Sequence, residues 1–246
     1  VIAGNWKMNK GVAEAVALLN DLLPQVKDIE DVEIVVCPTF TSLAAVSAAA
    51  RGSNVGVGAQ NVHWAESGAF TGEISAQMLG EIPVEYVIIG HSERRQYFGE
   101  SDETVNARLK AALAAGLKPI VCVGELLEQR QTEQTEAVVG TQMAGAMAGL
   151  SAAEMAQVII AYEPVWAIGT GLTASPEQAQ AAHAFIRGEI RARYADVAEG
   201  VRILYGGSVK PGNAADLMGQ PDLDGALVGG ASLKTEDFCG IIRNSR

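Results

Sequence analysis

Short, continuously apolar runs recur along the whole chain, and this recurrence constrains the fold more than any other feature. Eight runs rich in Val and Ile are separated by longer, Ala-rich stretches. They are apolar at every position rather than at alternate positions, which indicates parallel strands buried on both faces. The predicted strands are Val1–Ala3, Ile34–Cys37, Val55–Ala59, Tyr86–Ile89, Ile120–Val123, Val158–Tyr162, Ile203–Tyr205 and Ala226–Val228.

The stretches between these strands have the spacing of amphipathic helices. Pro176 follows Ser175 at a first helical turn, where proline is well tolerated. Eight strand–helix units in 246 residues predict an α/β fold: a (β/α)8 barrel of eight parallel strands with outer helices, forming a single domain over residues 1–246. The clearest helical stretches are Val12–Leu23, Ser42–Ala50, Glu103–Ala115, Glu177–Tyr194 and Glu236–Ile242.

A doubly wound sheet is the alternative fold. It would normally carry a glycine-rich phosphate loop after its first strand. Here the first strand runs into Asn5-Trp6-Lys7, with no such glycine pattern. The sequence therefore favours the barrel.

Composition and charge exclude several classes of protein. With 48% hydrophobic residues the chain can bury a large core without disulfide bonds or a metal. Its three widely spaced cysteines are expected to be reduced thiols of a cytoplasmic protein, with Cys122 in the core and no metal site among them.

No run approaches the ~20 apolar residues that cross a membrane, and no signal pattern is present. A short stretch is expected to precede Val1, because the chain does not begin with Met.

The net charge of −11 argues against a nucleic acid partner, because phosphate backbones select basic surfaces. It also means that an anionic substrate would have to be attracted by a local site against the global charge.

Polar residues at the ends of the strands are the candidates for chemistry, since barrel active sites form at the carboxyl ends of the strands. Asn5 and Lys7 follow the first strand. In an extended segment they would share one face, with Trp6 on the other. A lysine there would stabilise a phosphate or a developing oxyanion.

Two further candidates are His91 after the fourth strand and Glu163 after the sixth. His91 stands where the next helix would begin, and a helix N-terminus disfavours the charged imidazolium. A neutral ring can still donate a hydrogen bond to a carbonyl. Glu163 precedes Pro164 and an apolar segment, Val165–Thr170, with a glycine-rich exit that suits a lid. Dehydration under that lid is expected to make the carboxylate a stronger base.

Glycine pairs follow the last two strands, as Gly206-Gly207-Ser208 and Gly229-Gly230. Glycines let backbone N–H groups approach a bound oxyanion closely. Barrels often bind phosphate at this place with the help of a short extra helix, which Ala231-Ser232-Leu233 could form. We expect a phosphate site there.

Taken together, these motifs closely resemble the triosephosphate isomerase family. The resemblance extends from the first strand to the last, in the order of the family. It is carried by Gly4-Asn5-Trp6-Lys7-Met8-Asn9, Gly90-His91-Ser92-Glu93-Arg94-Arg95, the segment from Tyr162-Glu163-Pro164 to Gly169-Thr170-Gly171, Tyr205-Gly206-Gly207-Ser208-Val209, and Gly229-Gly230-Ala231-Ser232-Leu233.

The resemblance implies interconversion of dihydroxyacetone phosphate and glyceraldehyde 3-phosphate through an enediolate, in glycolysis and gluconeogenesis, without a cofactor or metal. It implies the base in Glu163, the neutral electrophile in His91 and the stabilising cation in Lys7. The implied substrate contacts are Asn5, Gly169, Ser208, Gly229 and Gly230. Ser92 is implied to contact the base before the lid closes, and Glu93 to support Lys7.

The resemblance also implies a homodimer. The segment Gln60–Gln77 matches a loop that inserts into the partner subunit, where Thr71 would approach the neighbouring active site. One departure from the family lies at the lid exit. This exit often reads Lys-Thr-Ala in the family but is Leu172-Thr173-Ala174 here, which leaves hinge kinetics open.

Two other functions remain open from the residues alone. One is a phosphosugar aldolase that uses Lys7 as a Schiff-base nucleophile. The other is a barrel that binds a phosphorylated metabolite without catalysis. The aldolase is disfavoured because nothing in the sequence is seen to activate Lys7 as a nucleophile, and the intact base and lid argue against the binding barrel.

Overall fold

The computed structural model describes residues 1–170 and 172–246, and the strands within these ranges form a closed parallel barrel. Each strand pairs with its neighbours in chain order, and β1 closes the barrel against β8 with Ile2 opposite Ala226. Closure excludes the doubly wound sheet and confirms the predicted barrel. The strands are β1 Ile2–Asn5, β2 Ile34–Cys37, β3 Val55–Ala59, β4 Tyr86–Ile89, β5 Lys118–Val123, β6 Ile159–Tyr162, β7 Ile203–Tyr205 and β8 Ala226–Val228.

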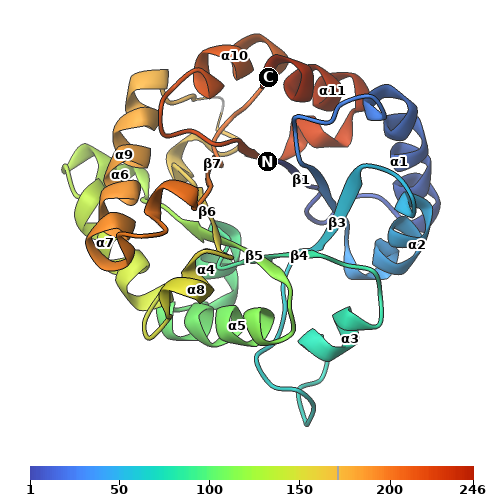
Figure 1. Ribbon diagram of the computed structural model, residues 1–246, viewed down its shortest axis with the longest axis horizontal. Helices are drawn as coiled ribbons and strands as arrows, with labels where there is room; N and C mark the ends of the chain where they lie inside the picture. The colour runs from blue at the N-terminus through green and yellow to red at the C-terminus, as the bar shows by residue number, and fades with distance from the viewer. Residues whose placement is uncertain (171) are drawn as a thin grey trace.

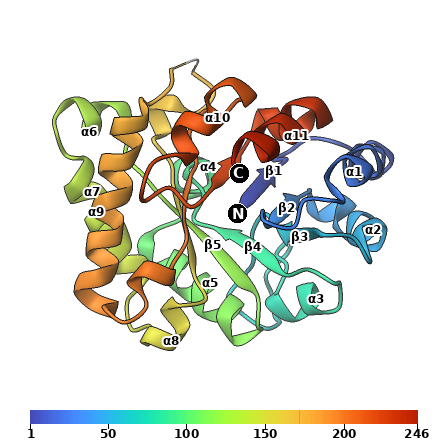
Figure 2. The ribbon, with the colours of Figure 1, turned by 45° about the horizontal axis from the view of Figure 1, so that its top comes forward.

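The helices form a ring outside the strands (Figures 1 and 2). Within the described residues none of them is both long and apolar enough to cross a membrane. The α-helices are α1 Val12–Val26, α2 Phe40–Ala50, α3 Ala76–Gly80, α4 Ser92–Phe98, α5 Asp102–Ala114, α6 Leu127–Gln131, α7 Thr135–Ala146, α8 Ala152–Met155, α9 Pro176–Tyr194, α10 Pro211–Met218 and α11 Thr235–Asn244. The short 3-10 helices in the described ranges are η1 Val165–Ala167, η2 Ala198–Gly200 and η3 Gly230–Leu233.

Local sequence explains where helix α9 begins. The Ser175 hydroxyl accepts a hydrogen bond from the backbone N–H of Gln178, whose side chain accepts one from the N–H of Ser175 in return. Pro176 occupies the first turn, as predicted. This reciprocal capping satisfies donors that a helix start leaves free, so α9 begins directly after the lid exit.

The core has two layers, because side chains of each strand alternate between the barrel interior and the outer helices. Ile88 of β4 lies in the interior cluster, whereas its neighbours Val87 and Ile89 pack in the outer one. Both faces are therefore buried, which is why the strands are apolar at every position. Cys122 lies in the interior cluster, and all three cysteines are buried free thiols, as predicted.

Candidate active site

A cavity of about 260 Å³ opens at the carboxyl ends of the strands. It brings together residues from the ends of β1, β4, β6, β7 and β8 with residues of the 165–170 segment. Ser92, Glu93 and Thr71 do not line this cavity. The predicted catalytic and substrate-binding residues all do, namely Asn5, Lys7, His91, Glu163, Gly169, Ser208, Gly229 and Gly230.

Glu163 lies at the centre of the site and is almost fully buried, with 2% of its surface exposed. Its backbone N–H donates to Val123 O at 2.8 Å, which fixes it directly beyond β6. One carboxylate oxygen lies 2.8 Å from Nε2 of His91, and the other accepts a hydrogen bond of 2.8 Å from the N–H of Ser92. The contact with Ser92 is thus made by its backbone, at the first residue of α4.

These contacts shift the pKa values of both partners. Burial raises the pKa of Glu163, but the contacts with His91 and the Ser92 amide outweigh it, so this pKa is lowered. Burial lowers the pKa of His91, but the Glu163 carboxylate outweighs it and raises this pKa. Burial by itself therefore makes the carboxylate more basic, but the contacts with His91 and the Ser92 amide reverse this effect. The carboxylate becomes more basic only when it leaves His91 and Ser92.

Hydrogen bonding also identifies the tautomer of His91. Its Nδ1 accepts from the backbone N–H of Glu93 at 3.2 Å, so Nδ1 carries no proton. The proton on Nε2 points at Glu163 and into the cavity. This hydrogen-bond pattern requires only the neutral ring, and the Glu163 carboxylate in contact with the ring accounts for its raised pKa.

Lys7 reaches the cavity by a backbone geometry that the sequence did not indicate. The residue lies in the left-handed region, at φ +52°, so the expectation of a continuous extended segment was wrong. Its N–H donates to Asn5 Oδ1 at 3.0 Å, and its carbonyl accepts from Gln60 Nε2 at 2.9 Å. Asn5 and Lys7 still face the same cavity, and Trp6 is buried in the outer core.

The side chain of Lys7 is held by Glu93. Its Nζ lies 2.5 Å from Glu93 Oε1, and both side chains remain partly exposed. Glu93 thus contacts Lys7, in agreement with the support that the resemblance implied.

The two glycines after β7 leave room for neighbouring side chains. A Cβ on Gly206 would stand 2.8 Å from Glu163 Cγ, and one on Gly207 would stand 2.2 Å from the Tyr205 hydroxyl. Gly230 has open space around it and begins the short helix η3, which confirms the predicted extra helix. The cavity wall is therefore open at Gly230 and closely packed at Gly206 and Gly207.

The lid segment begins as η1 and is attached to a residue that the sequence analysis missed. Trp166 Nε1 donates to Glu125 Oε1 at 2.9 Å, and Tyr162 donates to the same oxygen at 3.0 Å. Gly169 has φ +68°, which suits the predicted glycine-rich exit, whereas Gly171 lies outside the described residues. The sequence position that could have pointed to Glu125 is its place at the carboxyl end of β5, two residues after the last residue of the strand.

A closed parallel barrel, with a cavity at its strand ends lined by a buried carboxylate, an imidazole and a lysine, has the architecture of a barrel enzyme. Comparisons with known proteins identify the family. The sequence model of the family "Triosephosphate isomerase" matches residues 1–245.

Curated triosephosphate isomerases are similar over the whole chain. That of Alkaliphilus oremlandii is 58% identical over 243 residues, covering 98% of each chain. That of Trichlorobacter lovleyi is 56% identical over 244 residues, covering 99% of this chain and 97% of the relative. The crystal structure of triosephosphate isomerase from Bartonella henselae superposes with a TM-score of 0.90 at 40% identity, covering 99% of this chain and 97% of the other.

The chain belongs to the triosephosphate isomerase family. It binds triose phosphates and interconverts dihydroxyacetone phosphate and D-glyceraldehyde 3-phosphate, a reaction of glycolysis. This family membership sets aside the aldolase and the non-catalytic barrel.

Proposed function

We propose that Glu163 is the base that moves the proton between C1 and C2 of the triose phosphate through an enediolate. The observation that carries this role is the position of its carboxylate, which is buried at the cavity and bonded to both His91 and the Ser92 amide. A carboxylate that exchanges these bonds for the substrate gains basicity at the moment of proton transfer.

The other polar groups of the cavity have complementary roles. His91 donates its Nε2 proton to the substrate oxygens, because its Nδ1 is held as an acceptor by the Glu93 amide. Lys7 stabilises the negative charge of the enediolate. Asn5 holds the Lys7 backbone through its side-chain oxygen and contacts the substrate with its remaining amide group.

The phosphate group binds at Gly169, Ser208, Gly229 and Gly230. These residues all line the cavity, and the open space at Gly230 would admit a bulky anion against the backbone. Backbone N–H groups at such a place bind phosphate without adding charge to the protein.

Isomerisation in deuterated water tests the role of Glu163. Wild-type protein should introduce deuterium at the carbon that exchanges its proton, and Glu163→Gln should lose at least ~10²–10⁴-fold in kcat/KM. Glu136→Gln is the matched control, because Glu136 is exposed on α7. Turnover by Glu163→Gln at the level of the control would assign the base elsewhere.

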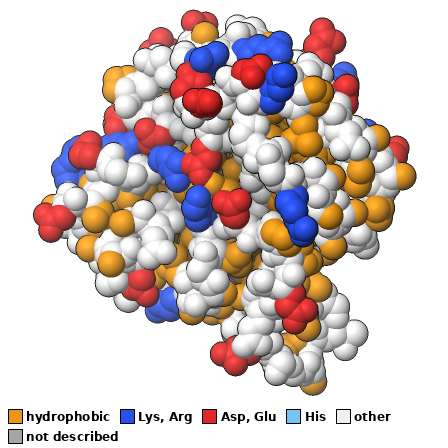
Figure 3. Space-filling model, turned by 45° about the vertical axis from the view of Figure 1, so that its right-hand side comes forward, with side chains coloured by type: hydrophobic (Ala, Val, Ile, Leu, Met, Phe, Trp, Pro, Cys, Tyr) orange, Lys and Arg blue, Asp and Glu red, His pale blue; other side chains and the backbone are white. Residues whose placement is uncertain are grey.

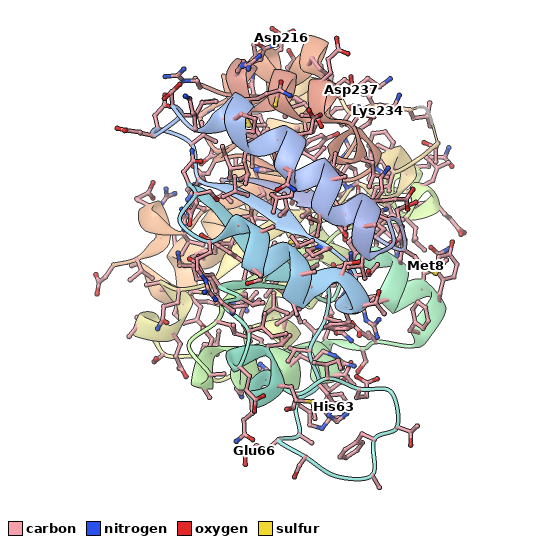
Figure 4. The ribbon with its side chains drawn as sticks, turned by 90° about the vertical axis from the view of Figure 1, so that its right-hand side faces the viewer. Met8, His63, Glu66, Asp216, Lys234 and Asp237 are labelled. Atoms are coloured by element: carbon pink, nitrogen blue, oxygen red, sulfur yellow. The ribbon has the colours of Figure 1, made fainter. Side chains whose placement is uncertain are left out.

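A homodimer is the assembly that the surface supports. The loop of residues 60–77 leaves the barrel between β3 and α3 and projects from the body of the molecule (Figures 1 and 3). Its side chains Trp64 and Phe70 are 42% and 45% exposed. His63 and Glu66 lie in this loop, well away from Met8 on the barrel (Figure 4).

A cavity beside the active site is a suitable binding place for the loop of a second subunit. It measures about 280 Å³ and shares Asn5, Lys7 and His91 with the substrate cavity. Exposed Met8 and Phe98 lie at its rim, at 94% and 67% exposure. Burying them beneath the partner's loop, with Thr71 at its tip, removes apolar surface from water.

The mass in solution tests the dimer. Wild-type protein should have twice the chain mass, and Phe70→Glu should be monomeric with lower kcat/KM. Leu127→Glu is the control, since Leu127 is 44% exposed on α6, outside the proposed contact. A monomeric wild-type protein, or a Phe70→Glu variant that dimerises like the control, would contradict the proposal.

We also propose that the chain forms a single domain and that the protein is cytoplasmic. One folding unit over residues 1–246 is supported by a barrel that closes its first strand on its last. A cytoplasmic location is supported by three buried free thiols, which suit a reducing compartment.

A further inference from the structure

The charges around the substrate cavity leave the capture of the substrate unexplained. A triose phosphate is a dianion near neutral pH, whereas the chain carries a net charge of −11. Glu163 lines the cavity, and the charge of Lys7 is offset by Glu93 at 2.5 Å. The neutral donors of the phosphate site act only at short range, so a cation without a carboxylate partner would help to draw a dianion toward the cavity.

Lys210 is a second lysine on the wall of this cavity. Its side chain is exposed, and no carboxylate in the described part of the chain forms an ion pair with it. Since Lys7 is already paired, Lys210 is the lining lysine whose charge is not offset.

The backbone fixes Lys210 beside the predicted phosphate contacts. Its N–H donates to Asn213 Oδ1 at 2.7 Å, and Asn213 Nδ2 donates to the carbonyl of Ser208 at 3.1 Å. One asparagine thus joins Lys210 and Ser208 into a single turn at the start of α10. The aliphatic stem can move, but it is attached at a fixed point on the cavity rim.

We propose that Lys210 is a second cation of the phosphate site, which captures the phosphate dianion at the rim and guides it to Ser208 and Gly230. This role rests on the phosphate site proposed above and adds a side-chain charge to its neutral donors. A charge at the mouth of a cavity raises association rates by about 10–10³-fold at low ionic strength. Salt weakens such an effect because it screens exposed charges.

Lys234 provides a matched control. Both lysines are exposed, precede a helix as its N-cap residue, and lack an ion pair among the described residues. Lys234 does not line the substrate cavity, and its side chain lies on the outside of the molecule at the start of α11, near Asp237 (Figure 4). Replacing either lysine changes the net charge equally.

The test measures kcat/KM for Lys210→Met and Lys234→Met from about 0.01 M to 1 M salt, where the screening length falls from ~30 to ~3 Å. Lys210→Met should lose about 10-fold in kcat/KM at low salt and approach the wild type at high salt. Its kcat should change much less. Lys210→Glu should lose more than Lys210→Met, and Lys234→Met should follow the wild type throughout.

Competition by inorganic phosphate separates this inference from the phosphate site itself. We expect phosphate to inhibit the wild type competitively and Lys210→Met more weakly. If phosphate does not compete even in the wild type, the phosphate site and the role of Lys210 both fail. If it competes equally in both, or if the loss in Lys210→Met is independent of salt or shared by Lys234→Met, only the role of Lys210 fails.

Discussion

The indole nitrogen of Trp166 donates a hydrogen bond of 2.9 Å to Glu125, a carboxylate with no exposed surface. Trp166 belongs to η1 at the start of the lid, whereas Glu125 lies beyond β5. Arg130 lies 3.6 Å from the same carboxylate oxygen and places its guanidinium over the Trp166 ring. The lid is therefore attached to the barrel by a buried, charged acceptor, in addition to its apolar packing.

Replacing Trp166 with Phe should loosen the lid without removing its aromatic ring. A hydrogen bond to a charged group contributes about 1.5–3 kcal/mol, so the lid should open roughly 10–100-fold more often. Hydrogen exchange measures this at the amide of Val165, which donates to Glu125 O at 3.1 Å, and at the amides of Ala167 and Ile168, which are bonded within the segment. Trp64→Phe, which alters an indole outside the lid, should leave these amides unchanged. Equal exchange in wild type and Trp166→Phe would show that apolar packing alone holds the lid.

Replacing Gly206 with Ala should displace Glu163. The added methyl would stand 2.8 Å from Glu163 Cγ and 3.0 Å from Tyr162 O, so Glu163 has to move. A misplacement of about 1 Å can cost 10²-fold in rate, and we expect at least that loss in kcat/KM. Gly212→Ala is the control, because nothing lies within 4 Å of its added methyl. A Gly206→Ala enzyme as active as this control would show that the site tolerates a shifted Glu163.

Sequence patterns predicted the strands well where every residue is apolar. β4 was predicted and found at Tyr86–Ile89, because its residues face apolar neighbours on both sides. β1 extends to the polar Asn5, which pairs in register with Cys37 of β2. β5 begins at Lys118, whose N–H donates to Glu85 O at 2.8 Å. A hydrophobic pattern therefore fails to predict the polar residues at which a strand continues through backbone pairing.

The sequence predicted which residues line the cavity, but it did not predict the hydrogen bonds that hold them there. Barrel topology brings every strand end to one cavity, so the position of Glu163 or His91 in the chain was enough to place it there. The left-handed turn at Lys7 depends on Gln60, 53 residues away, and the attachment of the lid depends on Glu125. Such long-range hydrogen bonds leave no local pattern.

Replacing Gln60 with Met tests whether the backbone of Lys7 is held in place. The Gln60 amide donates to the carbonyls of Lys7 and Cys37, both at 2.9 Å. Each lost bond should lower the free energy of unfolding by about 0.5–1.5 kcal/mol, and Lys7 should relax from a conformation that costs a non-glycine residue roughly 1–2 kcal/mol. We expect urea unfolding at lower concentration and a fall in kcat/KM. Gln25→Met, which removes an exposed amide bonded to Asp21 O, should change neither.

His183 should make stability depend on pH through a group far from catalysis. Its ring is fully buried, with Nδ1 3.1 Å from Asp222 O and Nε2 without a partner among the described residues. Burial lowers its pKa from 6.5 to about 4, the Asp222 carbonyl opposes this, and Arg187 adds to it. The neighbouring Tyr162 and Tyr205 rings offer no charge to stabilise an imidazolium.

The sign of the effect follows from proton binding. Between pH 6.5 and about 4 the unfolded chain binds a proton at His183 and the folded chain does not, so the free energy of unfolding falls as the pH falls. Over this window His183 should remove up to about 3 kcal/mol. Urea unfolding at pH 7 and pH 4.5 should show a smaller pH-dependent loss in His183→Gln than in the wild type, although the variant is less stable at pH 7. The same loss in both proteins would mean that the pKa of His183 is not lowered in the fold.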